Sequence, residues 1–174
     1  MERELRSPRN LADRIHATNR RRVWLWSYAP LFVWIAVIFF LSSPNGSAAN
    51  TSLIVGPLLH FFFPDISDAR LELVHALVRK SAHFTEYAIL ALLAIRAFTA
   101  STGLLYKLRW VLPLILVAAV AALDEFNQSF EPSRTSSPWD SVLDFTGGAV
   151  AILLCLAVSS LWRSRRAPSS VSRG

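Results

Sequence analysis

Long apolar runs alternate with short polar segments along the chain, and this pattern predicts four membrane-spanning helices. The runs lie at about 23–41, 81–100, 110–123 and 138–162. The first would extend roughly 28 Å as a helix, close to the thickness of the hydrocarbon layer of a bilayer. The pattern therefore predicts an all-α, polytopic membrane protein.

A shorter apolar run lies between the first and second predicted spans. It covers residues 52–63 and contains Gly56 and Pro57. A run of this length does not cross a bilayer as a straight helix, so we expect a re-entrant or an interfacial segment. Residues 69–79 have their apolar side chains on one helical face, and we interpret them as an amphipathic helix on the membrane surface. The chain would then turn into the membrane at Lys80.

The composition supports a membrane protein. Apolar residues make up 53% of the chain and charged residues 17%, and the apolar excess is concentrated in the long runs. The net charge of +6 could indicate a nucleic-acid partner. The basic residues crowd at the ends of the apolar runs, however, which is typical of membrane topology and of contact with anionic lipids. We therefore expect membrane lipids as partners and no nucleic acid.

Basic residues are most frequent in the two terminal segments, where residues 1–22 contain seven arginines and residues 163–174 contain four. The positive-inside rule then places both termini in the cytoplasm. The chain would comprise a basic tail (1–22), a transmembrane domain (23–162) and a second basic tail (163–174). A cleaved signal peptide is the competing interpretation of residues 23–41, but this run is long for a signal sequence and contains bulky aromatic residues.

With both termini inside, polar residues at the ends of three spans meet on the outer side of the membrane. A charge inside a membrane-length segment costs several kcal/mol unless it has a partner. We therefore expect these groups to lie together at one end of the helical bundle. The predicted polar cluster comprises Lys80, His83, Glu86, Tyr87, Asp124, Glu125, Gln128, Arg134, Asp140 and Asp144.

The segments that contain these residues resemble the signature of the VanZ-like family, named after a teicoplanin-resistance protein. They read KSAHFTEYAIL and DEFNQSFEPSRTSSPWDSVLDFTGG. In that family Lys and His precede a Glu-Tyr pair, Asp-Glu-x-x-Gln ends the next helix, and a Pro-x-Arg, an Asp and paired glycines follow. Pro132, Gly147 and Gly148 match as well, and Asp144 stands where Asn is most usual.

The resemblance covers about residues 30–160. It implies a multi-span protein of the bacterial inner membrane, with some relatives linked to glycopeptide resistance, and it does not supply an established reaction. Gly147 and Gly148 are interpreted as helix-packing residues, because small side chains let helices approach closely.

Three functions for the polar cluster stay open. The first is binding or shielding of an anionic or sugar-bearing cell-envelope lipid at the outer leaflet, with Lys80 and Arg134 facing the phosphate. The second is an intramembrane enzyme that acts on a lipid phosphate. Glu86, Asp124 and Asp144 would then hold a divalent cation. The third is a structural network of ion pairs that holds the helices in register.

The sequence alone identifies no catalytic residue, no cofactor and no metal site. His83 and Glu86 could place two ligands on one helical turn. A hydrogen-bonded structural histidine is nevertheless the commoner case, and His60 and His75 do not form a compact zinc pattern with His83. The single cysteine, Cys155, excludes an intramolecular disulfide and a multi-cysteine metal site. The oligomeric state and the presence of catalysis stay open.

Overall fold

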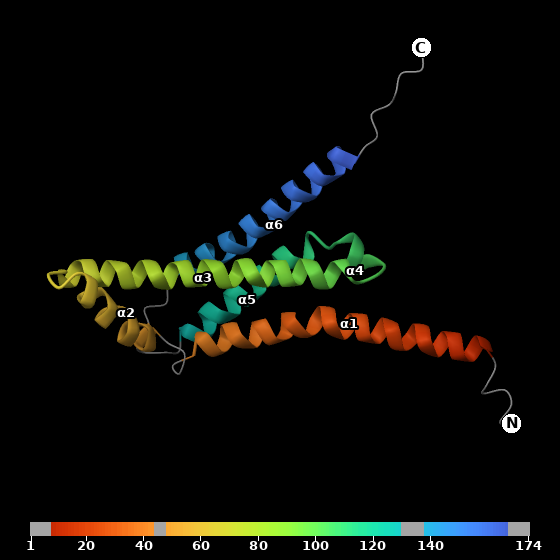
Figure 1. The fold of residues 1–174 in the computed structure, drawn as a ribbon, viewed down its shortest axis with the longest axis horizontal. Coiled ribbons are helices and arrows are strands. Elements are labelled where there is room, and N and C mark those ends of the chain that lie inside the picture. Colours follow the sequence, from red (N-terminus) through yellow and green to blue (C-terminus); the bar gives the residue numbers. More distant parts are fainter. Residues whose placement is uncertain (1–7, 44–47, 130–137, 167–174) are drawn as a thin grey trace, which may run out of the picture.

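A computed structural model describes the backbone of residues 8–43, 48–129 and 138–166 and the side chains of residues 22–43, 55–129 and 139–165. All regular structure in these ranges is helical, which agrees with the predicted fold class. Figure 1 shows the helices, which in chain order are α1 (Pro8–Leu41), α2 (Ala48–Phe62), α3 (Asp68–Thr99), α4 (Leu104–Lys107), α5 (Leu112–Gln128) and α6 (Pro138–Arg166).

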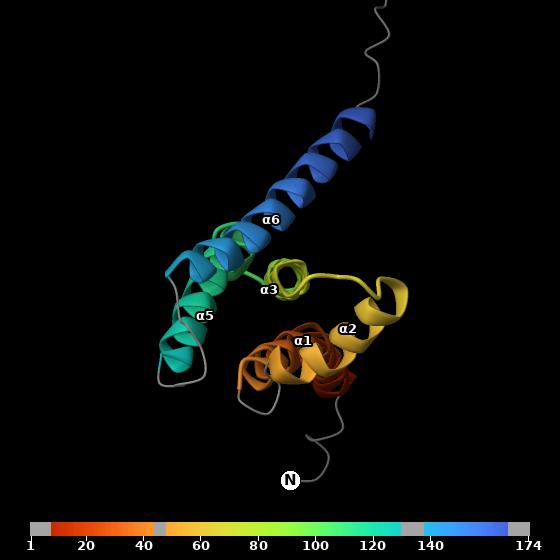
Figure 2. The same cartoon turned by 90° about the vertical axis from the view of Figure 1, so that its left-hand side faces the viewer.

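Helix α3 is the centre of the bundle. Figure 2 looks along it and shows α5 and α6 on one side and α1 and α2 on the other; α3 contacts all four of them. The inner half of α3 has several small residues on its buried face, which lets the neighbouring helices approach closely. Its buried residues are Tyr87, Leu90, Ala91, Ala94 and Ala97.

The expected break at Lys80 is wrong, because residues 68–99 form one continuous helix. No glycine or proline interrupts these 32 residues, so nothing in the backbone stops the helix. The first turns lie beside α2 (Figure 1), although Leu73, Leu77 and Val78 stay exposed. At 1.5 Å per residue α3 is about 48 Å long, more than the roughly 30 Å of hydrocarbon in a bilayer.

Helix α2 corresponds to the short apolar run, and Pro57 lies inside it. Its 15 residues extend about 22 Å, which is too short to cross the hydrocarbon layer. In Figure 1 it leads from the end of α1 to the start of α3 without turning back into the bundle. The rings of Phe61 and Phe62 are exposed and pack edge to face. This arrangement favours the interfacial interpretation.

Within the described part of the chain, two helices contain stretches long and apolar enough to cross a membrane, at 22–41 in α1 and 139–165 in α6. They coincide with the first and fourth predicted spans. Helix α5 has only 17 residues, and the second half of α3 carries Glu86 and Arg96 among its apolar residues. For α3 and α5, crossing of the membrane therefore stays a prediction.

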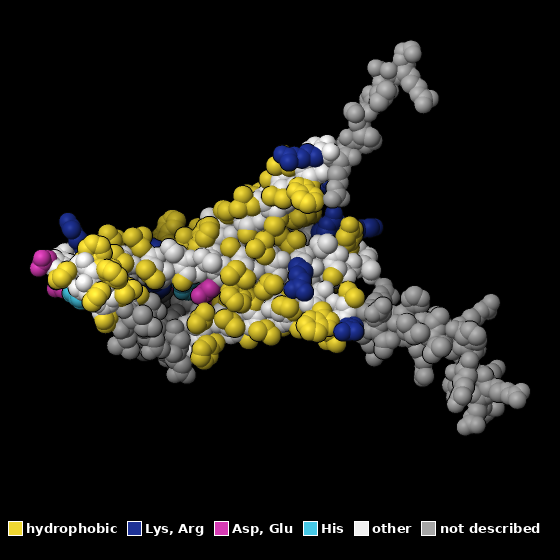
Figure 3. Space-filling view, viewed as in Figure 1, with side chains coloured by type: hydrophobic (Ala, Val, Ile, Leu, Met, Phe, Trp, Pro, Cys, Tyr) yellow, Lys and Arg dark blue, Asp and Glu magenta, His cyan; other side chains and the backbone are white. Residues whose placement is uncertain are grey.

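The outer surface of the bundle is apolar. Figure 3 shows hydrophobic side chains along its middle and Lys and Arg side chains at the end where α1 begins and α6 ends. Soluble proteins rarely expose a continuous apolar surface of this extent, whereas helices in contact with lipid require one. The exposed large apolar residues include Trp26, Phe32, Phe40, Phe61, Ile115, Leu123, Leu153, Leu161 and Trp162.

Helix α1 begins at Pro8, so it continues through most of the arginine-rich segment that composition assigned to a tail. Its apolar part is joined by hydrogen bonds to α3 and to the turn that follows α3. Trp34 Nε1 donates to the carbonyl oxygen of Glu86 at 2.9 Å, and Arg96 Nη2 donates to the carbonyl oxygen of Trp26 at 3.0 Å. The hydroxyls of Tyr28 and Ser101 lie 2.7 Å apart. These bonds fix the position of α1 along α3.

Helix α6 contacts α3 and α5 at two adjacent glycines. A Cβ atom on Gly147 would collide with the backbone carbonyl oxygen of Phe84 in α3, and one on Gly148 would lie 2.6 Å from Cγ1 of Val117 in α5. Only a residue without a side chain allows this approach of α6 to the α3 backbone. The contact lies one turn from Asp144, so it also positions the polar residues at the start of α6.

Candidate functional site

Asp124 joins three segments of the chain through one carboxylate oxygen. It lies in the last turns of α5 and is 1% exposed. Its Oδ2 accepts hydrogen bonds from Ser42 Oγ at 2.9 Å, from Gln128 Nε2 at 2.8 Å and from the Tyr87 hydroxyl at 3.4 Å. Ser42 directly follows α1 and Tyr87 belongs to α3. A buried carboxylate needs such donors, because burial removes its water.

His83 in α3 faces Asp144 in α6. The distance from Nδ1 of His83 to Oδ1 of Asp144 is 3.4 Å, and the side chains are 20% and 5% exposed. At this distance the two side chains form an ion pair if the imidazole is protonated. The two atoms do not have the geometry of a hydrogen bond. His83 lies one turn before Tyr87, so the same face of α3 serves both Asp144 and Asp124.

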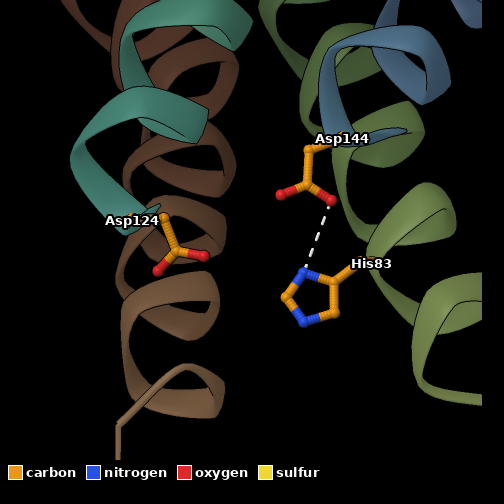
Figure 4. Close-up of side chains that lie close together, drawn as sticks. All are labelled: His83, Asp124 and Asp144. Carbon is orange, nitrogen blue, oxygen red and sulfur yellow. Dashed lines mark ion pairs between the residues drawn. The ribbon is translucent and has the colours of Figure 1, made fainter. Parts of the chain in front are cut away.

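The side chains of His83, Asp124 and Asp144 converge. One ligand-type atom from each lies within 4.8 Å of the other two. Figure 4 shows that the imidazole and both carboxylates point into one space between α3, α5 and α6. Three buried atoms of these residues, Nδ1 of His83 and Oδ1 of each aspartate, have no hydrogen-bond partner among the described residues. We call these three residues the His83 triad.

A small polar pocket opens beside the triad. The volume in which the centre of a water-sized sphere fits is about 10 Å³. This is enough for one water molecule or one ion. Lys80 is exposed at this pocket, and Arg79 and Asp140 are half-buried. Among the charged residues of the pocket, Lys80 is therefore the most exposed and Asp144 the most buried. Its lining residues are Arg79, Lys80, His83, Gln128, Asp140, Leu143 and Asp144.

An apolar groove is lined mainly by residues of α3 and α6. Its volume is about 850 Å³. Phe84 and Gly147 line one end, and Trp162 and Arg163 line the other. Phe84 directly follows His83, and Gly147 lies one helical turn after Asp144. In Figure 1, α6 diverges from α3 toward the end that carries the C-terminus, which opens this space.

The structure brings together most, but not all, of the predicted cluster. Glu86 and Glu125 are half-buried and lie outside the His83 triad. Arg134 and Pro132 fall outside the described residues. The predicted cluster residues that line the pocket or bond to Asp124 are Lys80, His83, Tyr87, Asp124, Gln128, Asp140 and Asp144.

Sequence reasoning missed Ser42 and Arg79. Ser42 is the first polar residue after the first apolar run. The predicted topology puts that end of the run on the same side as the polar cluster, so this signal could have identified it. Arg79 had been assigned to the polar face of a surface helix, and the continuity of α3 is what brings it to the pocket.

The bundle has an apolar outer surface, and buried polar side chains from three helices converge inside it. These are features of a membrane protein. The VanZ/LLP1 family model matches residues 27–161. This protein therefore belongs to the VanZ/LLP1 family, as the sequence motifs predicted, and the match includes all three residues of the His83 triad. No curated protein matches the chain. No solved structure matches it either.

Proposed function

We propose that this protein binds an anionic lipid of the cell envelope, with the lipid headgroup at the polar pocket and a lipid chain in the α3–α6 groove. The observation that carries the proposal is the position of the pocket and the groove. Their linings use neighbouring residues of the same two helices, His83 and Phe84 in α3 and Asp144 and Gly147 in α6, so a polar space and an apolar groove lie close enough for one amphiphile.

The charges at the pocket suit a phosphate and a hydroxyl-bearing headgroup. Lys80 and Arg79 supply cations near the mouth, and an arginine can bind two phosphate oxygens at once. Asp140 and Gln128 offer hydrogen-bond partners for sugar or glycerol hydroxyls. The inner space of about 10 Å³ is too small for a headgroup, so the phosphate would stay at the mouth. By its sequence position Arg134 would add a third cation there.

The groove suits the chain of such a lipid. From Gly147 to Trp162 the groove follows α6 over about 22 Å, at 1.5 Å per residue, which exceeds half of the roughly 30 Å hydrocarbon layer. The groove therefore has the length to hold a chain that crosses the leaflet in which the headgroup lies. In the cell, sequestering an envelope lipid in this way would shield it from a glycopeptide that targets lipids.

The proposal places the polar pocket at the outer leaflet of a four-span protein with cytoplasmic termini. We expect cysteines introduced singly at Ser81 and at Ser129, in a Cys155→Ala background, to react with a membrane-impermeant maleimide added to intact cells. A cysteine at Ser164, near the end of α6, should react only after the membrane is opened. All three serines are exposed. Labelling of Ser164 in intact cells would overturn the proposed orientation.

Lipid binding is expected to depend on the two cations at the pocket. The double substitution Arg79→Gln and Lys80→Gln should weaken binding of phosphatidylglycerol by tenfold or more, since a hydrogen bond to a charged group contributes about 1.5–3 kcal/mol. Binding would be measured with the purified protein in detergent by native mass spectrometry, with phosphatidylcholine as the lipid without net charge.

The matched control is Arg70→Gln, which removes a cation from an exposed position of the same helix away from the pocket. It should leave the affinity for phosphatidylglycerol unchanged. Equal losses in the control and in the double variant would mean that the lipid only responds to net charge, and the pocket would not be its site. An unchanged affinity in the double variant would also count against the proposal.

The His83 triad favours a second candidate function, hydrolysis of a lipid phosphate by an intramembrane enzyme. Carboxylates and a histidine directed at one space are the groups that hold a metal-bound water or move a proton. Turnover of a lipid phosphate by the purified protein, lost in His83→Gln, would support it. Binding of the lipid without turnover would leave the first proposal as the function.

A further inference from the structure

We propose that the His83 triad is a binding site for one divalent metal ion of the Zn²⁺ or Mn²⁺ type, held between α3, α5 and α6. The atoms left free of hydrogen bonds to act as ligands are Nδ1 of His83, Oδ1 of Asp124 and Oδ1 of Asp144. The proposal does not depend on lipid binding, because the triad lies further in than the cations at the mouth of the pocket.

The first argument is that each of the three ligand atoms is buried and lacks a hydrogen-bond partner among the described residues. Asp124 and Asp144 are 1% and 4% exposed, so water does not readily solvate their carboxylates. Two ionised carboxylates that face one imidazole carry excess negative charge, and isolated buried charges cost several kcal/mol. A divalent cation in the shared space would balance this charge and would bond all three atoms.

The second argument is geometric. The distance of 3.4 Å between Nδ1 of His83 and Oδ1 of Asp144 is close to the roughly 3.3 Å that separates two ligands of a tetrahedral ion at bonds of about 2.0–2.1 Å. The three ligand atoms lie within 4.8 Å of one another. To complete the site, the carboxylate of Asp124 would have to move by about 1 Å. A small rotation of its side chain is enough for this movement.

The third argument is the support of Asp124 by its neighbours. All three hydrogen bonds to this carboxylate, from Ser42, Tyr87 and Gln128, reach Oδ2. They fix the carboxylate and leave its Oδ1 without a hydrogen-bond partner among the described residues. Metal-ligating carboxylates are commonly held in this way, with one oxygen bound by protein donors and the other available to the ion.

The ligand set decides the type of ion. Ca²⁺ takes six to eight oxygen ligands and Mg²⁺ keeps several waters, so neither suits one nitrogen and two oxygens in a space this small. Zn²⁺ accepts nitrogen and oxygen ligands and holds a water at its fourth position when three come from protein. Mn²⁺ also combines imidazole with carboxylates. The space beside the triad has room for one such water.

The charges at the mouth of the pocket refine the proposal. Lys80 and Arg79 oppose the entry of a free cation, but they favour an anion at the open position of a bound ion. The competing explanation is a protonated His83 paired with Asp144, with a water molecule bridging to Asp124. That arrangement would bind no metal, which makes the two explanations distinguishable.

The test is metal loading of the full-length protein, purified without an affinity tag that binds metal. After treatment with a chelator the protein is loaded separately with Zn²⁺ and Mn²⁺, dialysed and assayed by inductively coupled plasma mass spectrometry. We expect about one ion per chain in the wild type and at least a hundredfold weaker binding in His83→Gln and in Asp144→Asn. Loaded wild-type protein should also unfold at a higher temperature than the stripped protein.

Two controls separate the triad from other binding. Asp140→Asn removes a carboxylate of the pocket outside the triad, and His60→Ala removes an exposed histidine; both should keep one ion per chain. If His83→Gln does not accumulate, the visible spectrum of Co²⁺-loaded wild type still reports nitrogen and oxygen ligation at a defined site. A folded wild-type protein that binds no ion, or equal binding in the wild type and in Asp144→Asn, would overturn the proposal.

Discussion

Asp124→Ala is expected to lower the free energy of unfolding by about 3–5 kcal/mol, because it leaves three buried donors without an acceptor and each costs about 1–3 kcal/mol. The donors are Ser42, Tyr87 and Gln128, which belong to three different parts of the bundle. Removing a buried carboxylate also relieves its own desolvation, which offsets part of this loss. The measurement is denaturant unfolding of the purified protein in detergent, with protein accumulation in the membrane as a second readout.

Asp124→Asn separates the two effects. The amide oxygen can still accept from Ser42 and Tyr87 without a charge, so this variant should lose much less stability than Asp124→Ala. Asp140→Ala is the control at a half-buried carboxylate in the first turn of α6, where we expect a loss below about 1 kcal/mol. Wild-type stability in Asp124→Ala would show that the hydrogen bonds to Oδ2 do not hold the helices together.

Gly147→Ala is expected to have the largest effect on helix packing. The new Cβ atom would meet the carbonyl oxygen of Phe84, which belongs to the backbone of α3 and cannot rotate away. Helix α6 must therefore move outward, at a cost of about 1–3 kcal/mol or more for overpacking. The same movement would separate Asp144 from His83. Thermal unfolding and the yield of folded protein would measure the loss.

Two other glycines provide the comparison. Gly148→Ala would meet the Val117 side chain rather than backbone, so partial adjustment is possible and the loss should be smaller. Gly56→Ala in α2 meets nothing within 4 Å, and alanine in a helix is favoured over glycine by about 0.5–1 kcal/mol. If Gly147→Ala were as stable as Gly56→Ala, the close contact of α6 with α3 would not exist in the protein.

The sequence predicted the polar cluster through helical spacing, but it could not specify the rotation of each helix. Counted from His83 at 100° per residue, Tyr87 lies about 40° away on one side and Glu86 about 60° away on the other. Either could face the other helices, and a small rotation of α3 decides between them. The structure directs Tyr87 to Asp124 and leaves Glu86 outside the triad.

Other features depend on contacts between distant segments, which spacing does not reveal. Ser42 carries no pattern of its own, and its role follows from the position of the end of α1 beside Asp124. The continuity of α3 at Lys80 depends in part on α2, which packs against its first turns. Helix α6 diverges from α3 toward its C-terminal end (Figure 1), and a pair of glycines predicts close approach but no crossing angle.

The uninterrupted backbone of α3 has a mechanical consequence. If the part from Ser81 onward spans the bilayer, the part from Asp68 to Lys80 forms a stiff rod of about 20 Å that projects beyond it. Because no glycine or proline forms a hinge, a displacement of the projecting end would be transmitted along α3 to His83. His83 would then move relative to Asp144. A large molecule that binds the projecting end of α3 would in this way weaken the contact between these two side chains and the binding of any ligand between them.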